Sequence, residues 1–148
     1  MIQRLKELLG RYREQLLYLI FGVLTTLVDW GVSFFLYRFW GEAIEAQTFL
    51  IHGANLIAWS AAVLFAFVTN RRLVFQSTRR GFLPVLGELF AFAGGRVMTL
   101  LLQEGMFLLF FDLLGWNEYA VKLIAAILVV ILNYLISKLL IFRNKRRE

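Results

Sequence analysis

The chain has 148 residues, of which 60% are hydrophobic, and its mean hydropathy is +0.71. Because the apolar share of soluble domains is about 45–50%, this composition indicates a membrane protein. The chain carries a formal net charge of +6, no cysteine and a single histidine, so the sequence indicates neither a disulfide framework nor a metal site. It also lacks the common catalytic and nucleotide-binding motifs, and we expect a protein that is not an enzyme and has no cofactor.

The first fourteen residues, MIQRLKELLGRYRE, predict an amphipathic helix at the inner membrane surface. Apolar side chains recur on one helical face, at Ile2, Leu5, Leu9 and Tyr12, and basic residues cover much of the remainder. Helices of this kind lie in the interface between lipid and water. We therefore expect a cytoplasmic segment at residues 1–14, followed by a transmembrane domain at residues 15–148.

Four apolar runs follow, each long enough to cross a bilayer core, which takes about 20 helical residues. They are Leu16–Tyr37, Phe49–Thr69, Leu89–Leu113 and Tyr119–Phe142. The predicted fold class is therefore all-α, a polytopic membrane protein with four transmembrane helices and an N-terminal interfacial helix. The loop between the second and third runs holds the only proline, Pro84, and is expected to follow the inner membrane surface.

Basic residues are concentrated before the first run, between the second and third, and after the fourth. They are Arg4, Lys6, Arg11, Arg13, Arg71, Arg72, Arg79, Arg80, Arg143, Lys145, Arg146 and Arg147. Because cytoplasmic loops of membrane proteins are enriched in Lys and Arg, this placement predicts a multi-pass cell-membrane protein with both termini in the cytoplasm. It argues against nucleic acid as a partner and in favour of anionic membrane lipid.

The two halves of the chain share a pattern. AFVTNRRLVF at residues 66–75 returns as NYLISKLLIF at residues 133–142, an offset of 67, and the first and third runs align at an offset of 74. The second offset pairs Gly22 with Arg96, Thr25 with Thr99 and Asp29 with Gln103. We therefore expect two parallel two-helix repeats, at residues 16–75 and 88–142.

Small residues mark a packing surface in the second run. Alanine recurs at every fourth position, at Ala54, Ala58, Ala62 and Ala66. Small residues at this spacing allow membrane helices to approach closely. The alanines therefore predict a contact between helices.

Polar residues within the apolar runs are the candidates for function. A charged side chain at the centre of a bilayer costs about 2.5–3.5 kcal/mol on insertion scales, so such groups usually face the protein interior or a wet cavity. Asp29 either binds a substrate hydroxyl, transfers a proton, or fixes helix packing. Bases near the ends of the helices suit a lipid phosphate, which Arg binds with a planar fork and Lys as a point charge. The predicted substrate-binding residues are Thr25, Asp29, Arg71, Arg72, Arg96, Thr99, Gln103, Glu104, Asn133 and Lys138.

Together these features resemble the GtrA-like family of small four-helix membrane proteins across residues 14–143. The resemblance lies in the acid of the first run, the NRRLVF ending of the second, the basic opening of the third and the NYLISKLLIF ending of the fourth. It implies translocation (flipping) of a polyprenyl-phosphate-linked sugar across the cytoplasmic membrane, for cell-surface polysaccharide or teichoic-acid glycosylation. It also implies a glycosyltransferase partner. Because four helices enclose little volume, we expect either a homodimer or a complex with that enzyme.

Two other classes of function stay open at this point. The protein is alternatively a non-transporting membrane subunit that docks a glycosyltransferase and presents its lipid substrate. A small proton-coupled exporter would also keep an acid in its first helix, but it would need neither the bases for phosphate nor the doubled motif.

Overall fold

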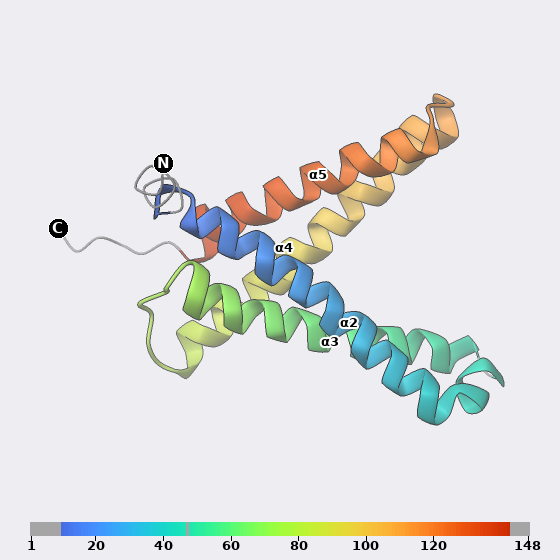
Figure 1. Ribbon diagram of the computed structural model, residues 1–148, viewed down its shortest axis with the longest axis horizontal. Helices are drawn as coiled ribbons and strands as arrows, with labels where there is room; N and C mark the ends of the chain where they lie inside the picture. The colour runs from blue at the N-terminus through green and yellow to red at the C-terminus, as the bar shows by residue number, and fades with distance from the viewer. Residues whose placement is uncertain (1–9, 47, 143–148) are drawn as a thin grey trace, which may run out of the picture. The chain divides into compact units, whose positions relative to one another are not determined.

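The computed structural model describes the backbone of residues 10–46 and 48–142 and the side chains of residues 10–41 and 50–142. Every regular element in these ranges is helical. The chain divides into two compact units, Met1–Gln76 and Ser77–Glu148. Each unit contains one pair of long antiparallel helices (Figure 1).

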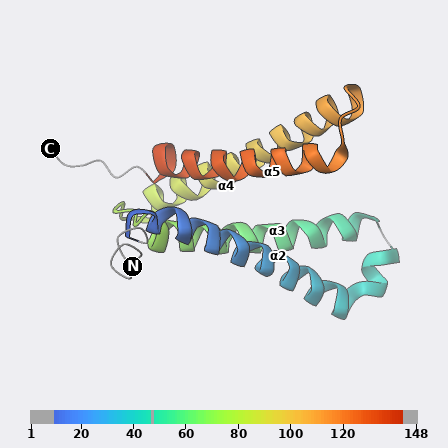
Figure 2. The same ribbon diagram turned by 45° about the horizontal axis from the view of Figure 1, so that its top comes forward.

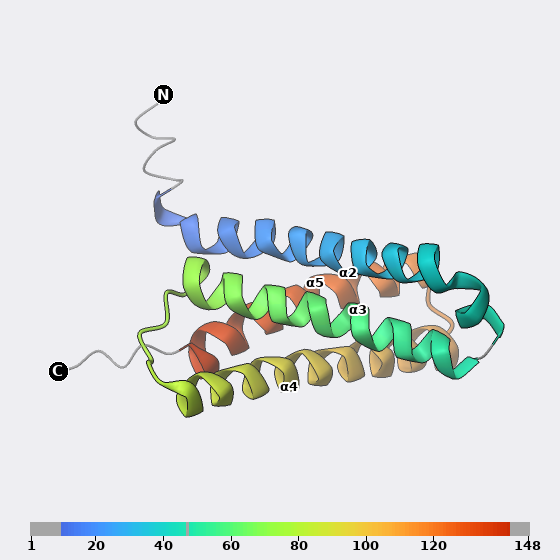
Figure 3. The same cartoon turned by 90° about the horizontal axis from the view of Figure 1, so that it is seen from below.

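Unit 1 pairs α2, Arg13–Ala46, with α3, Thr48–Thr69, and α3 continues into a π-helix, η1, at Asn70–Val74. The two long helices run side by side (Figures 2 and 3). A kink interrupts α2 at Trp40, where φ is −128° and ψ is 16°. Alanines line the contact face of α3, since Ala54, Ala58, Ala62 and Ala66 are all buried. The predicted packing surface is therefore present within this helix pair.

Unit 2 pairs α4, Phe82–Phe107, with α5, Glu118–Ile136, and each helix is extended by a π-helical segment. These segments are η2, Leu108–Leu113, and η3, Ser137–Ile141. Gly115, at φ +66°, adopts the left-handed conformation that ends η2. Asn117 then caps α5, because its side chain accepts a hydrogen bond from the backbone N–H of Ala120 at 3.1 Å.

The 67-residue offset of the repeated motif relates two of these π-helices, η1 and η3. Each closes with a backbone hydrogen bond of 2.8 Å, from the N–H of Phe75 to Asn70 O and from the N–H of Phe142 to Ser137 O. Both closing rings pack on the first helix of their own unit. Phe75 lies 6.1 Å from the ring of Tyr18, and Phe142 lies 5.8 Å from the ring of Phe92. Tyr18 and Phe92 are themselves related by the 74-residue offset of the first helices.

Four helical spans in the described ranges are long and apolar enough to cross a membrane, which confirms the predicted polytopic all-α fold. They are Arg13–Gly41, Leu50–Val74, Phe82–Leu113 and Glu118–Ile141. The third begins at Phe82, earlier than the predicted Leu89, and so includes Pro84. A proline is tolerated in the first turn of a helix, where its missing N–H would have no intrahelical partner. Of the predicted interfacial helix, residues 1–9 lie outside the described residues.

Candidate functional site

The predicted substrate-binding residues of α2 in unit 1 are Thr25 and Asp29, one helical turn apart. Thr25 is buried and its hydroxyl donates to the backbone carbonyl of Phe21 at 2.7 Å, so its hydrogen bond stays within its own helix. Asp29 is half-buried, and its side chain makes no hydrogen bond or ion pair with the residues that the structure describes. An acid in an apolar helix without an internal partner is available to a ligand or a proton.

The predicted phosphate-binding bases of unit 1, Arg71 and Arg72, lie in the π-helix η1. Arg71 is half-buried and Arg72 is exposed. Asn70, the first residue of η1, is buried, and its side-chain N–H donates to Ala66 O at 2.7 Å. Asn70 therefore anchors the start of η1. π-helical turns of this kind are frequent at functional sites.

In unit 2, Arg96 is held by aromatic rings. Its guanidinium lies 4.7 Å above the ring of Phe92, and that ring packs on Phe142 at the end of η3. Lys138 is exposed in η3, donates to the hydroxyl of Tyr134 at 3.0 Å and lies 5.4 Å from the centre of that ring. Two cations of unit 2 are thus each placed against an aromatic side chain, in cation–π contacts.

Thr99 and Asn133 join the two helices of unit 2. The Thr99 hydroxyl donates a hydrogen bond that is shared by two acceptors, Arg96 O at 3.0 Å and Asn133 Oδ1 at 3.1 Å. Thr99 is buried and Asn133 is half-buried. Gly95, beside this contact, lies so close to α5 that an added Cβ would meet Ile136 Cγ2 at 3.2 Å. The helices therefore lie in close contact beside the predicted polar residues.

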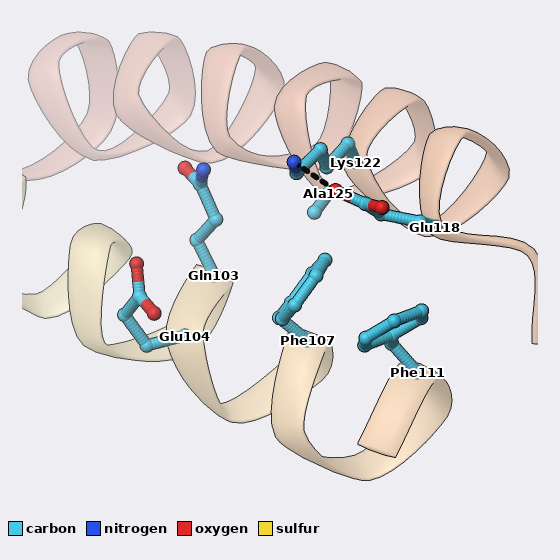
Figure 4. Close-up of a pocket in the computed structure, with 7 residues that line it drawn as sticks. All are labelled: Gln103, Glu104, Phe107, Phe111, Glu118, Lys122 and Ala125. Carbon is cyan, nitrogen blue, oxygen red and sulfur yellow. Dashed lines mark hydrogen bonds and ion pairs between the residues drawn. The ribbon is translucent and has the colours of Figure 1, made fainter. Parts of the chain in front are cut away.

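Gln103 and Glu104 line a pocket between the two helices of unit 2, with a volume of about 340 Å³. Figure 4 shows the side chains of Gln103 and Phe107 projecting from α4 toward α5, with Glu104 beside them. On the α5 side, the ammonium of Lys122 donates to the carboxylate of Glu118, one turn away. The remaining lining residues are Phe111 and Ala125.

Glu88 is a buried acid of unit 2 that no pattern in the sequence had pointed to. Its side chain has no exposed surface, accepts a hydrogen bond from Ser77 Oγ at 2.7 Å and lies 3.7 Å from Arg79 Nε. Glu88 thereby holds the loop at the start of unit 2 against α4. Its partners are supplied by the loop, so the hydropathy of the helix alone could not have identified this contact.

The structure thus brings two groups of predicted residues together in unit 2: Thr99 with Asn133, across the two helices, and Gln103 with Glu104, at the pocket. The guanidinium of Arg96 lies on the ring of Phe92 instead. Thr25 and Asp29 lie on α2 in unit 1, and Arg71 and Arg72 lie in η1. Five further pocket residues were not predicted as site residues: Phe107, Phe111, Glu118, Lys122 and Ala125. For the first four, the signal in the sequence is the i, i+4 spacing of Phe107 with Phe111 and of Glu118 with Lys122, which places both members of each pair on one helical face.

This arrangement of two helix pairs, with polar residues on the first helix and a basic π-helix after the second, defines a small multi-pass membrane protein. The model of the GtrA/DPMS transmembrane-domain family matches residues 17–142. The chain belongs to this family.

Curated relatives match over most of both chains. The chain is 33% identical to the uncharacterized membrane protein YwcD of Bacillus subtilis, over 89% of its own length and 98% of the relative. It is 35% identical to the cell wall teichoic acid glycosylation protein GtcA of Listeria monocytogenes, over 88% of its length and 86% of the relative. The GtcA protein of Listeria innocua is 34% identical over similar shares, 88% and 86%. No solved structure matches the chain.

Proposed function

We propose that this protein moves a polyprenyl-phosphate-linked sugar across the cytoplasmic membrane, where the sugar serves glycosylation of a cell-surface polysaccharide or teichoic acid. The family and the relatives named for teichoic acid glycosylation support the pathway. A glycosyltransferase that makes or uses the sugar lipid is the expected partner, and a homodimer is the alternative assembly.

The observation that carries the proposal is a polar row along α4. Arg96, Thr99 and Gln103 follow at i, i+3 and i+7, on one helical face. Thr99 bonds to α5 and Gln103 lines the pocket against α5, so the row follows the contact between the two helices. The headgroup of the lipid is polar and its phosphate is charged, and both are costly in hydrocarbon. A row of polar groups along a span lowers this cost.

Each end of the row suits a different part of the substrate. The guanidinium of Arg96 is a forked donor for phosphate. The amide of Gln103 both donates to and accepts from sugar hydroxyls. The isoprenoid tail is apolar and stays in the lipid during the movement, so only the headgroup needs a protein path.

The test uses purified protein in liposomes loaded on one side with a short-chain polyprenyl-phosphate glucose. We expect wild-type protein to expose the sugar lipid on the other side. Arg96→Ala removes a base of the row on α4, and Asp29→Asn removes the unpartnered carboxylate of α2, which we expect to bind a sugar hydroxyl. Each change lowers the initial rate at least about tenfold, which corresponds to roughly 1.4 kcal/mol of lost stabilisation.

Matched controls remove the same groups outside the proposed path. Asp112→Asn changes an exposed acid in η2, and Arg80→Ala changes an exposed base of the loop before α4. Both are expected to leave the rate unchanged. Absence of transfer by folded wild-type protein would contradict translocation, and it would favour a subunit that presents the lipid to a glycosyltransferase.

A further inference from the structure

The pocket of unit 2 has the composition of a small-ligand site. Its volume of about 340 Å³ lies in the range of about 300–1,000 Å³ that is typical of such sites. It combines two phenyl rings with an amide, two carboxylates and an ammonium group. It is formed by the far ends of α4 and η2 and the start of α5, beside the connection at residues 114–117.

Two of its polar groups are available for a ligand. The side chains of Gln103 and Glu104 make no hydrogen bond or ion pair with the residues that the structure describes. A carboxylate and an amide in an apolar span are costly unless they have partners. Hydroxyl groups of a ligand would supply them, because the carboxylate accepts hydrogen bonds and the amide does both.

The rings form an apolar wall next to these groups. Phe107 and Phe111 are stacked, with centroids 4.8 Å apart and planes inclined by 30°. A sugar ring has an apolar C–H face and a rim of hydroxyls, and it can place the first on the phenyl rings and the second on Gln103 and Glu104. Aromatic walls with a few convergent polar groups are the usual design of small-molecule sites.

The charges of the pocket do not favour phosphate. Among its lining residues Lys122 is the single base, and it is paired with Glu118, so a phosphate would find no unpaired cation there. The Lys122 ammonium also lies 5.5 Å from the centre of the Phe107 ring, in a cation–π contact. A neutral polyhydroxyl group needs no such counter-charge.

The pocket begins where the polar row of α4 ends. At 1.5 Å per residue along α4, Arg96 lies about 10 Å from Gln103 and about 16 Å from Phe107. Gln103 is therefore shared by the row and the pocket, and the phenyl rings contact a sugar that has moved further from Arg96.

We propose that this pocket binds the glycosyl headgroup at the end of its path, on the side of the 114–117 connection. The proposal rests on the proposed function, and it adds the site at which the sugar itself is recognised. It assigns sugar binding to Phe107 and Glu104, with Gln103 and Phe111 beside them, and it makes the pocket responsible for distinguishing a glycosylated lipid from a bare one.

Equilibrium binding to purified protein in nanodiscs tests this assignment, because both faces of a nanodisc are open to ligand and no transport is needed. The probes are short-chain polyprenyl phosphates carrying glucose, galactose or N-acetylglucosamine, and the same lipid without sugar. We expect wild-type protein to bind at least one glycosylated probe about tenfold more tightly than the bare lipid, a difference of roughly 1.4 kcal/mol.

Phe107→Leu and Glu104→Gln each reduce this preference to about twofold or less, while the affinity for the bare lipid is unchanged. Phe90→Leu is the matched control, because Phe90 lies on the same helix and is 68% exposed. It should retain the full preference. Melting temperatures in detergent show that each variant is folded.

The outcomes separate this proposal from the proposed function. Equal binding of glycosylated and bare lipid by wild-type protein would overturn the sugar site, as would a preference that survives both substitutions. Saturable binding of tetraphenylphosphonium in place of sugar lipids would also overturn it and identify a cation site. A preference that depends on Phe107 and Glu104, in a protein that transfers nothing in liposomes, supports the pocket and contradicts translocation.

Discussion

At the scale of single residues, the two units differ where their first and second helices meet. Thr25 and Thr99 occupy equivalent positions and both are buried. Opposite Thr99 stands Asn133, which shares its hydrogen bond, whereas the equivalent position in unit 1 is Ala66, which has no exposed surface and no polar side chain. Unit 2 is therefore joined by a polar contact between helices, and unit 1 by close packing.

This difference predicts unequal effects of the same substitution. Thr99→Val removes the bond to Asn133 and is expected to lower the free energy of unfolding by roughly 0.6–1.7 kcal/mol, the range of hydrogen bonds between membrane helices. Thr25→Val removes only a bond to its own helix backbone and should cost less. Unfolding in mixed micelles measures both. A double-mutant cycle with Asn133→Ala isolates the pair, and a coupling energy near zero would contradict the assigned bond.

At the scale of elements, the small residues of the packing surface decide how closely the two helices of a unit approach each other. Ala58 on α3 and Ala125 on α5 are related by the 67-residue offset, and each is 1% exposed. In each unit the first and second helices pack on each other. The bilayer supplies no hydrophobic driving force between helices, so close packing at small residues is a main source of stability for a helix pair.

Ala58→Leu therefore forces the helices of unit 1 apart. We expect a loss of about 1–3 kcal/mol in the free energy of unfolding, as for added volume in a filled core. The control is Ala126→Leu, the exposed neighbour of Ala125 on α5, which should have little effect because its side chain points away from the packing surface. If the two substitutions lower the free energy of unfolding equally, the loss comes from placing leucine in a helix and not from the packing at Ala58.

The π-helices are the second feature at this scale. An extra residue in the final turn changes the direction in which the following side chain points. In both units that side chain is the closing phenylalanine, which packs on an aromatic ring of the first helix. The repeated motif thus has a structural explanation in each unit, independent of any role of its bases.

At the scale of the whole molecule, the distribution of charge predicts how the four spans are inserted. The loop before α4 contains Arg79 and Arg80, whereas the connection at residues 114–117 has no base. The positive-inside pattern therefore places the first in the cytoplasm and the second outside.

The native chain has no cysteine, so single introduced cysteines report this orientation directly. We expect Leu114→Cys to react with a membrane-impermeant maleimide in intact cells. Arg80→Cys should react only after the membrane is made permeable. Both native side chains are exposed in the structure. Labelling of the Arg80→Cys variant in intact cells would contradict the predicted orientation.

Local sequence determined most of the helical framework. Hydropathy over about 20 residues is sufficient to locate a span, and the offsets of 67 and 74 identified the pairs of positions that form equivalent contacts in the two units. The sequence also identified Thr99 and Asn133 as polar candidates, because polar residues are conspicuous in apolar runs. The substrate-binding roles of these residues stay predictions.

Tertiary structure decided what depends on the distance and rotation between helices. The bond between Thr99 and Asn133 joins residues 34 positions apart. The pocket beside Gln103 depends on how α4 and α5 pack on each other, and the burial of Glu88 depends on where the loop returns to α4. Hydropathy assigns each residue to a span, but contacts such as these are set by how two spans pack, which no single stretch of sequence encodes.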